Sequence, residues 1–409
     1  MWRQQGRNAY NDKEIEMQDV FILGAARTAI GTFGGTLKGF LPAQLGIIAA
    51  KEAIARAGVD AAEIDNSVFG QVCPAEGHDA YLARRIGLGA GLPVSGIAHA
   101  VNRLCGSGAQ AIVTAAQMIQ LGESVIGLAG GAESMSNAPM VVEGMRWGTK
   151  MGNAVVNDWL HTTLHDPWGN GHMGCTGENV ADRYGISRER QDAYSVESQR
   201  RAVAAIADGR FKEQIVGIEL KTRKGVVLFD TDEHPRANTT LEDLAKLKPV
   251  FRKEGGTVTA GNASGMNDAA GAVVLAGADT VKAKGLKPIA RIVASASAGV
   301  APEVMGLGPI EAIPLALKRA GLTLGDIDVI ESNEAFAVQS IAVADVLGFD
   351  PAKVNPNGGA VALGHPLGAT GAILTTKCIY ELKRIGGRYG LITMCIGGGQ
   401  GIALIIENV

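Results

Sequence analysis

The chain has 409 residues, of which 46% are hydrophobic and 19% are charged. This length predicts two or three structural units, and the composition argues against a disordered chain. The formal net charge of -3 argues against nucleic acid as the main partner, because phosphate binding needs a basic surface.

Five cysteines form no Cys-x-x-Cys pair and follow no secretory leader, which indicates free thiols in a reducing, cytoplasmic compartment. No apolar run reaches membrane-spanning length, so we expect no membrane partner. The first 16 residues are polar and mix both charge signs. We expect residues 1–16 to form a flexible tail, with the fold beginning near Met17.

Two segments about 260 residues apart in the chain are alike. Residues 56–70 read RAGVDAAEIDNSVFG, and residues 319–333 read RAGLTLGDIDVIESN. Each predicts a helix that ends at a glycine, then a short acidic link and a buried strand. The separation is too long for a solenoid repeat and indicates duplication of a whole domain.

The duplication extends further along the chain. Residues 101–131 and 354–399 both read as strand, glycine bend, helix, glycine and strand, which is typical of βαβ units in a mixed or parallel sheet. The helices predicted at 109–121 and 368–380 are apolar nearly all round. We therefore expect both to lie between two sheets, with their N-termini near the centre of the molecule.

The region between the two copies has a different character. It contains three of the four tryptophans, Trp147, Trp159 and Trp168. Residues 200–253 hold twelve Lys or Arg against eight Asp or Glu, an excess of four positive charges. This excess indicates either a solvated helical face or an inserted subdomain that holds an anionic ligand.

Two of the thiols stand against glycine-rich bends. Cys105 directly precedes a predicted helix, whose N-terminus would lower the thiol pKa and, with Gly106 and Gly108, leave backbone N–H groups open to a ligand. Cys395 lies at the exit of the last predicted strand, and Ile396 and three glycines follow it. Packing in the core is the commoner role for a single cysteine of either kind.

His365 lies at the bend of the second copy that is equivalent to the bend at Cys105. The repeat therefore predicts that the two residues lie close together, as a nucleophile and its base. Asn333 ends a predicted strand and could simply cap the following helix. Each signal alone is weak, but all of these residues fall at converging bends.

Seven segments together are similar to the thiolase family: NRLCGSG, GGAESMS, HMGCTGENVA, GTVTAGNASGMNDAA, NEAFA, GGAVALGHPLGATGA and CIGGGQG. They occur in order from about Val20 to the C-terminus and resemble short-chain acetyl-CoA acetyltransferases and β-ketothiolases in particular. The resemblance implies an α/β, five-layer αβαβα fold with two duplicated βαβ-rich halves and an inserted loop domain.

The resemblance also implies domain boundaries. Residues 17–136 with about 262–285 would form the N-terminal half, and residues 286–409 the C-terminal half. Residues 137–261 would form the inserted loop domain, which would bind coenzyme A (CoA) and support oligomerisation.

The family roles transfer to the residues at the converging bends. Cys105 corresponds to the acylated nucleophile, His365 to the base that activates it, and Cys395 to the acid/base that acts on the second substrate. Asn333 corresponds to the residue that positions a water of one oxyanion hole. The backbone N–H groups of Gly397 and Cys105 correspond to the donors of the second oxyanion hole.

Acyl-CoA molecules are the implied substrates, and no permanently bound cofactor is implied. By resemblance, Arg236 would meet the adenosine end of CoA and Ser264 the pantetheine arm. His172 and Met173 would lie where the pantetheine enters the pocket.

Phe251 and Met305 resemble residues that line the pocket near the acyl group. They suggest a short acyl chain, but one extra methylene changes binding by only ~1–3 kcal/mol, so the acyl range stays open. His161 and His165 have an i, i+4 spacing without the glutamate of an HExxH motif, and we expect no metal site there.

The implied reaction is the reversible Claisen condensation of two acetyl-CoA to acetoacetyl-CoA plus CoA, or thiolysis of short-chain 3-ketoacyl-CoA, through acyl-Cys105. A broader-range 3-ketoacyl-CoA thiolase of fatty-acid degradation is an alternative. A non-catalytic thiolase-like lipid-binding protein would be expected to lack one of the central residues. Ketosynthases place histidine or asparagine where this chain has Cys395, and papain-like hydrolases lack the duplicated architecture.

The Trp-bearing segment 145–168 is amphipathic without an evident role inside the chain. Exposed aromatic patches usually mark contacts between proteins. Together with the resemblance, this predicts a homotetramer built as a dimer of dimers.

Overall fold

The computed structural model describes residues 18–223 and 225–409. The tail expected at residues 1–16 and the start expected near Met17 lie outside the described residues. In the described part, no helix has both the length and the apolar character needed to cross a membrane.

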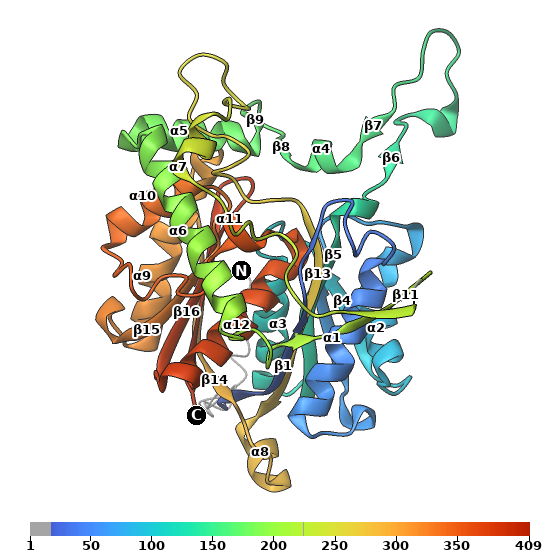
Figure 1. The fold of residues 1–409 in the computed structure, drawn as a ribbon. Helices are drawn as coiled ribbons and strands as arrows, with labels where there is room; N and C mark the ends of the chain where they lie inside the picture. The colour runs from blue at the N-terminus through green and yellow to red at the C-terminus, as the bar shows by residue number, and fades with distance from the viewer. Residues whose placement is uncertain (1–17, 224) are drawn as a thin grey trace, which may run out of the picture.

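The molecule is built from five layers, helices outside, then a sheet, then helices at the centre, then a second sheet and outer helices (Figure 1). The first sheet half has the strand order β4-β3-β5-β13-β1. Its strands are β1 (Val20–Thr28), β3 (Asn66–Gly70), β4 (Ile97–Val101), β5 (Ile126–Ser134) and β13 (Asn267–Gly277). The α/β fold implied by the resemblance is confirmed.

The second sheet half has the strand order β15-β16-β17-β14. Its strands are β14 (Ala290–Gly299), β15 (Ile327–Ser332), β16 (Tyr389–Ile396) and β17 (Gln400–Asn408). Each half has a parallel pair, β3 with β5 and β15 with β16, that is followed by antiparallel pairs. The first half has one further strand, β4, parallel to β3. The two halves therefore repeat one topology, as the sequence repeat predicted.

The expectation of two separate sheets is wrong in one respect. β1 and β14 pair antiparallel along a short stretch, where Val20 lies opposite Ile292 and Ile22 opposite Ala290. Within the described residues, this pairing joins both halves into one 11-stranded sheet.

The central layer consists of α3 (Ser107–Gln120) and α12 (Thr370–Ile385), which pack against each other and against strands of both halves (Figure 1). A largely aliphatic cluster from both halves surrounds them. The outer layers contain α1 (Pro42–Ala57) and α2 (Leu82–Ala90) on one side, and α9 (Gly308–Ala320) and α10 (Ala337–Leu347) on the other.

The repeated segments fold alike. α1 ends at Gly58 and α9 ends at Gly321, each with φ +66°, a left-handed conformation that favours glycine. Short 3-10 helices follow at Ala61–Glu63 and Leu324–Asp326, and then β3 and β15 begin. The predicted order of helix, glycine, acidic link and strand is confirmed in both copies.

A long segment between β5 and β13 covers the end of the central helices and sends out an arm at β6 and β7 (Figure 1). Its elements are β6 (Met140–Val141), β7 (Asn157–Asp158), α4 (Trp159–Thr163), β8 (His165–Asp166), β9 (Gly171–His172), α5 (Met173–Tyr184), α6 (Arg188–Ala207), β10 (Ile215–Val216), β11 (Ile218–Thr222), β12 (Gly225–Phe229) and α7 (Leu241–Ala245). The remaining short elements are β2 (Gly31–Thr32), α8 (Ala278–Lys284) and α11 (Ala360–Leu363).

A buried ion pair anchors this segment to the first sheet half. Arg27 on β1 donates two hydrogen bonds to the carboxylate of Asp232, at 2.7 and 2.9 Å, and a third to Gln214 at 2.7 Å. Both charged side chains are fully buried. Because the guanidinium and the carboxylate match as a bidentate pair, the segment has a fixed position beside β1.

Candidate active site

The N-terminal ends of α3 and α12 cross in backbone contact. A Cβ on Gly371 would lie 2.1 Å from the backbone N of Ala109, and a Cβ on Gly108 would lie 2.8 Å from the carbonyl O of Gly368. Only glycine permits this approach. The crossing brings the bend before α3, which carries Cys105, next to the bend before α12, which carries His365.

Cys105 follows a residue in an uncommon conformation. Leu104 has φ +47°, in the left-handed region that costs roughly 1–2 kcal/mol for a residue with a side chain. Asn102 Oδ1 accepts the Leu104 N–H at 3.1 Å, and the Ser107 hydroxyl donates to the Leu104 carbonyl at 2.6 Å. These bonds hold the turn that directs Cys105 into the pocket described below, and nothing in the sequence had marked Leu104.

Burial dominates the chemistry of the Cys105 thiol. It raises the pKa to about 11, although the backbone N–H groups of Gly397 and of Cys105 itself point at the sulfur and oppose the shift. The lowering that a helix end can cause is therefore outweighed by burial. Because the thiol is neutral at pH 7, it needs a base.

His365, the predicted base, lines the same pocket as Cys105. Burial lowers its pKa to about 4, so its imidazole is neutral at pH 7. Its backbone N–H donates to Asn267 Oδ1 at 3.0 Å. Its ring nitrogens face two uncharged partners, since Nδ1 lies 2.7 Å from Thr370 Oγ1 and Nε2 lies 3.4 Å from Asn333 Nδ2.

Asn333 comes directly after β15 and is fully buried. It does not cap α10, whose N-cap is Phe336, so the capping alternative for Asn333 is wrong. Its Oδ1 has no hydrogen-bond partner among the described residues. A buried oxygen of this kind is a site where a water or a ligand is expected to donate.

Cys395 lies on β16, one residue before that strand ends, and is fully buried. Burial raises its pKa well above the usual range, and Cys105 raises it further. Cys395 packs with Met305 and Phe336 in one apolar cluster and does not itself line the pocket that contains Cys105. The following turn needs glycine, because Gly398 and Gly399 have φ +81° and +84°.

A pocket of about 300 Å³ contains Cys105 and His365 together. The residues expected at the pantetheine arm and the acyl group all line it: Ser264, His172, Met173, Phe251 and Met305. Arg236 lies instead in an adjoining hollow with Glu233 and His234, which shares Met266 with the pocket. The residues predicted to contact CoA thus line two adjoining spaces, whereas Asn333 and Cys395 line neither of them.

A second pocket, of about 330 Å³, reaches Cys105 from another side. Leu104, Leu164, Trp168 and Gly398 are among its lining residues. Sequence reasoning missed this pocket, because the residues that form it come from bends that lie far apart in the chain.

Three histidines gather beside the two pockets, one of which His172 lines and the other His165. The His161 and His165 ring centroids lie 4.1 Å apart, and those of His165 and His172 lie 5.2 Å apart. His172 stacks on Phe251 at 4.6 Å, and burial, with a smaller effect from its two neighbours, lowers its pKa to about 4. In residues 18–223 and 225–409, no group of three or more His, Cys, Asp or Glu is arranged to hold a metal ion.

Glu133 is a further site residue that sequence reasoning missed. Its buried carboxylate accepts the N–H groups of Val72, Cys73 and Gly368 at 3.0, 3.1 and 2.7 Å. It therefore ties a loop of the first half to the bend that follows His365. A single charged residue within the apolar run IGLAGGAES was the available signal.

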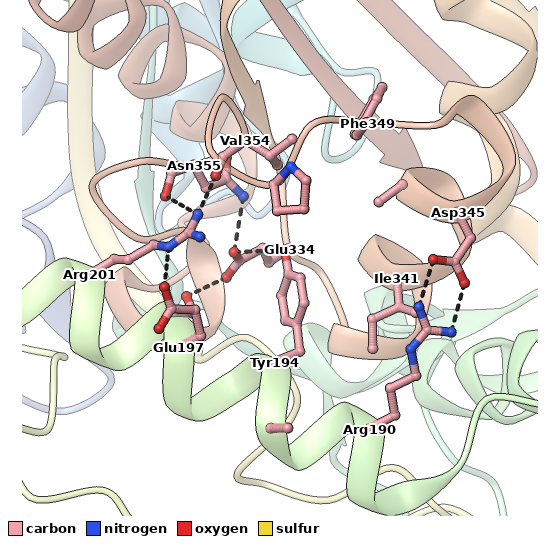
Figure 2. A pocket seen from close by; sticks show the side chains of 14 residues that line it. Arg190, Tyr194, Glu197, Arg201, Glu334, Ile341, Asp345, Phe349, Val354 and Asn355 are labelled. Carbon is pink, nitrogen blue, oxygen red and sulfur yellow. Dashed lines mark hydrogen bonds and ion pairs between the residues drawn. The ribbon is translucent and has the colours of Figure 1, made fainter.

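Glu334, the neighbour of Asn333, is held in place by hydrogen bonds to its carboxylate (Figure 2). Tyr194 and Ser198 on α6 donate to it at 3.0 and 2.7 Å, and Asn355 Nδ2 donates at 3.0 Å. It lies at a pocket of about 370 Å³ that is separate from Cys105. These hydrogen bonds fix the position of Glu334 and therefore that of the backbone at Asn333.

Comparison with known proteins gives a consistent result. Residues 20–279 match the family described as "Thiolase, N-terminal domain", and residues 286–408 match "Thiolase, C-terminal domain". Beta-ketothiolase BktB of Cupriavidus necator is 55% identical over 392 residues, which cover 96% of this chain and 100% of that protein. An acetyl-CoA acetyltransferase of Syntrophomonas wolfei is 50% identical over 395 residues, with 95% and 99% covered.

Solved structures agree with these sequence matches. The crystal structure of human mitochondrial 3-ketoacyl-CoA thiolase in complex with CoA has a TM-score of 0.93 to this structure, at 46% identity. The match covers 96% of this chain and 98% of that one.

Proposed function

This chain belongs to the thiolase family, and we propose that it acts as an acetyl-CoA C-acetyltransferase and β-ketothiolase through an acyl group carried on Cys105. The observation that supports this mechanism most is the shared pocket. There a neutral imidazole and a neutral thiol lie together, and two backbone N–H groups point at the sulfur.

Thiolysis begins with Cys105. His365 takes the thiol proton as Sγ attacks the 3-keto carbon, and the N–H groups of Cys105 and Gly397 stabilise the oxyanion. The bond between the α-carbon and the 3-keto carbon then breaks. Cys395, protonated because burial raises its pKa, gives its proton to the departing α-carbon, and acetyl-CoA leaves.

The second half returns the enzyme to its starting state. Free CoA gives its thiol proton to the Cys395 thiolate and attacks the acyl group. Cys105 leaves as a thiolate and recovers its proton from the His365 imidazolium. In condensation the steps run backwards, and a water on Asn333 Oδ1 together with the His365 N–H stabilises the enolate oxygen.

Coenzyme A enters, in this proposal, past the hollow at Arg236, whose guanidinium makes no ion pair with any described residue. An unpaired positive charge at a pocket mouth suits the phosphates of the adenosine end. Ser264, His172 and Met173 then contact the pantetheine arm, and Phe251 and Met305 the acyl end. No permanently bound cofactor is part of the proposal.

The second pocket favours the broader-range alternative. It adjoins Cys105 and is lined largely by apolar residues, so an acyl chain longer than acetyl could extend into it from the sulfur. Thiolysis rates measured over a series of 3-ketoacyl-CoA chain lengths test this. Rates that fall sharply beyond the four-carbon substrate would restrict the enzyme to acetoacetyl-CoA.

We also propose a homotetramer, a dimer of dimers, in the cytoplasm. β4 leaves an open edge at one end of the sheet, and Ile97 on it is 52% exposed. An unpaired edge strand is a natural contact for a second copy. The boundaries 17–136 with 262–285, 137–261 and 286–409 belong to the same proposal, with 137–261 as the loop domain for CoA and oligomerisation.

The test separates the two half-reactions. Cys105→Ala should abolish both, whereas Cys395→Ala should still form the acyl-enzyme on mixing with acetyl-CoA but lose at least about 100-fold in overall turnover. The acyl adduct is followed by intact-protein mass spectrometry, and turnover by cleavage of acetoacetyl-CoA. Near-normal turnover of Cys395→Ala would refute its proton-transfer role, and an adduct on Cys105→Ala would refute the nucleophile.

A further inference from the structure

The imidazole of His365 has a partner that no step above uses. Its Nδ1 lies 2.7 Å from the hydroxyl oxygen of Thr370, the first residue of α12. Both side chains are buried, His365 at 4% and Thr370 at 3% exposure. Water therefore does not compete for this hydrogen bond.

The direction of the bond follows from a count of hydrogens. A threonine hydroxyl has one hydrogen, and Thr370 donates it to the backbone carbonyl of Pro366 at 3.0 Å. A carbonyl can only accept, so the hydroxyl hydrogen used in this bond is not available to Nδ1 of His365. In the bond to His365, the Thr370 oxygen then accepts, and the Nδ1–H group donates.

The position of this hydrogen decides which nitrogen is basic. A neutral imidazole carries one N–H, so a hydrogen on Nδ1 leaves Nε2 with a free lone pair. Nε2 faces Asn333 Nδ2, a donor, at 3.4 Å, which agrees with that arrangement. We propose that Thr370 is a positioning residue that holds His365 in the Nδ1–H tautomer and so presents Nε2 to the Cys105 thiol.

The uncharged character of Thr370 has its own consequence. A carboxylate on Nδ1 would stabilise the imidazolium that forms when Cys105 loses its proton. Among the described residues, the ring nitrogens of His365 contact only the hydroxyl of Thr370 and the amide of Asn333. The imidazolium is therefore only weakly stabilised, and it returns its proton readily to the departing Cys105 thiolate. This inference rests on the base role proposed for His365.

Helix α12 supplies a matched control. Thr376 is also buried, and its hydroxyl donates to the carbonyl four residues earlier, Ala372, at 2.9 Å. Thr370 and Thr376 therefore share the helix, the burial and the local bond, but only Thr370 contacts His365. Thr370→Val and Thr376→Val remove the same group, and Thr370→Ser retains the hydroxyl.

The experiment compares these variants by kcat and by the rate of Cys105 acylation with acetyl-CoA. Thr370→Val should lose about tenfold or more in both rates, since one hydrogen bond to the reacting tautomer is removed. Thr370→Ser should recover most of the loss, and Thr376→Val should stay within about threefold of the wild type. Melting temperatures show whether each variant is folded.

Neutron diffraction from crystals of the deuterated wild-type enzyme reads the tautomer directly, whatever the variants do. Deuterium on Nδ1 alone supports the proposal, and deuterium on Nε2 alone overturns it. If Cys105 of the Thr370→Val variant is acylated at the wild-type rate, the proposal is also overturned. If His365→Ala itself acylates normally, the base role has failed. If His365→Ala is inactive and Thr370→Val is normal, only the role of Thr370 has failed.

Discussion

Cys105 and His365 are both neutral for the same reason, which is removal from water. Burial disfavours the charged form of any group, so it raises the pKa of the thiol and lowers that of the imidazole. The sequence places Cys105 at a helix end, whose positive potential can lower a thiol pKa. At this buried helix end, the cost of desolvating a thiolate exceeds that potential.

The first prediction concerns the reactivity of Cys105 without substrate. Because its pKa is about 11, its thiolate fraction at pH 7 is roughly two orders of magnitude below that of free cysteine, and alkylation by iodoacetamide should be correspondingly slow. The rate should rise about tenfold per pH unit up to about pH 11. Cys105→Ala measures the background from the other thiols. Fast alkylation that is independent of pH between 5 and 8 would instead reveal a preformed thiolate–imidazolium pair.

The second prediction concerns Glu133. Burial raises its pKa from 4.5 to about 7, against the opposing N–H groups of Gly368, Cys73 and Val72. A carboxyl group with a raised pKa contributes stability that is complete below about pH 4.5 and is lost as the pH rises through about 7. Glu133→Gln removes this titration, so the variant should gain stability relative to the wild type across that window, by at most about 3 kcal/mol.

Melting curves from pH 4.5 to 8 measure the difference. Altered hydrogen bonds can shift the stability of the variant by the same amount at every pH. Such a shift does not affect the test, because the prediction concerns only how the difference in stability changes with pH. Glu213→Gln, at an exposed carboxylate paired with Lys383, is the control and should track the wild type. Parallel curves for Glu133→Gln and the wild type would show that Glu133 stays ionised throughout.

At the scale of elements, the contact between α3 and α12 organises the site. Gly371 faces the backbone of Ala109 with no room for a Cβ, and both helices start at bends that carry reactive residues. A change at this crossing therefore acts on Cys105 and His365 together. The site depends on a helix–helix distance that no residue of the catalytic set determines by itself.

The third prediction follows from this crossing. Alanine favours a helix over glycine by about 1 kcal/mol, so Gly371→Ala would stabilise α12 if packing did not intervene. The new Cβ would lie 2.1 Å from the Ala109 nitrogen, and such overpacking costs about 1–3 kcal/mol. We expect a lower melting temperature and a loss of turnover. Gly325→Ala, whose Cβ would meet only Thr323 Oγ1 at 3.6 Å, is the control, and equal behaviour of the two variants would contradict the packing argument.

The elements differ in how far the sequence predicted them. The helices at 107–120 and 370–385 were predicted at 109–121 and 368–380, from residues that are apolar nearly all round. The two glycine-ended repeats follow from left-handed helix ends. The pairing of β1 with β14 could not be predicted, because it depends on how two separately folded sheets meet along an edge. Leu104 and Thr370 were missed for a similar reason, since their conformation or contacts arise only once distant bends converge.

At the scale of the whole molecule, a single copy of the chain exposes large apolar side chains to solvent. The arm between β6 and β7 extends away from the five layers (Figure 1), and residues 143–156 are exposed. Trp147 and Met151 on this arm are 85% and 94% exposed. Soluble proteins rarely leave such side chains in water, so the proposed contact with a further copy through the arm would account for them. The edge strand β4 would then serve the other proposed contact.

The fourth prediction separates these two contacts. If the arm joins dimers and β4 joins monomers, the double substitution Trp147→Asp and Met151→Asp should halve the mass from that of a tetramer to that of a dimer. Each large apolar side chain contributes about 1.5–3 kcal/mol when it is buried, and a carboxylate in its place adds a desolvation cost. Light scattering coupled to gel filtration measures the mass. Leu315→Asp, at an exposed leucine on the outer helix α9, should leave the tetramer intact. A wild-type protein that elutes as a monomer would refute both contacts, and a double variant that stays tetrameric would refute the role of the arm, because two buried charges per chain could not be accommodated in that interface.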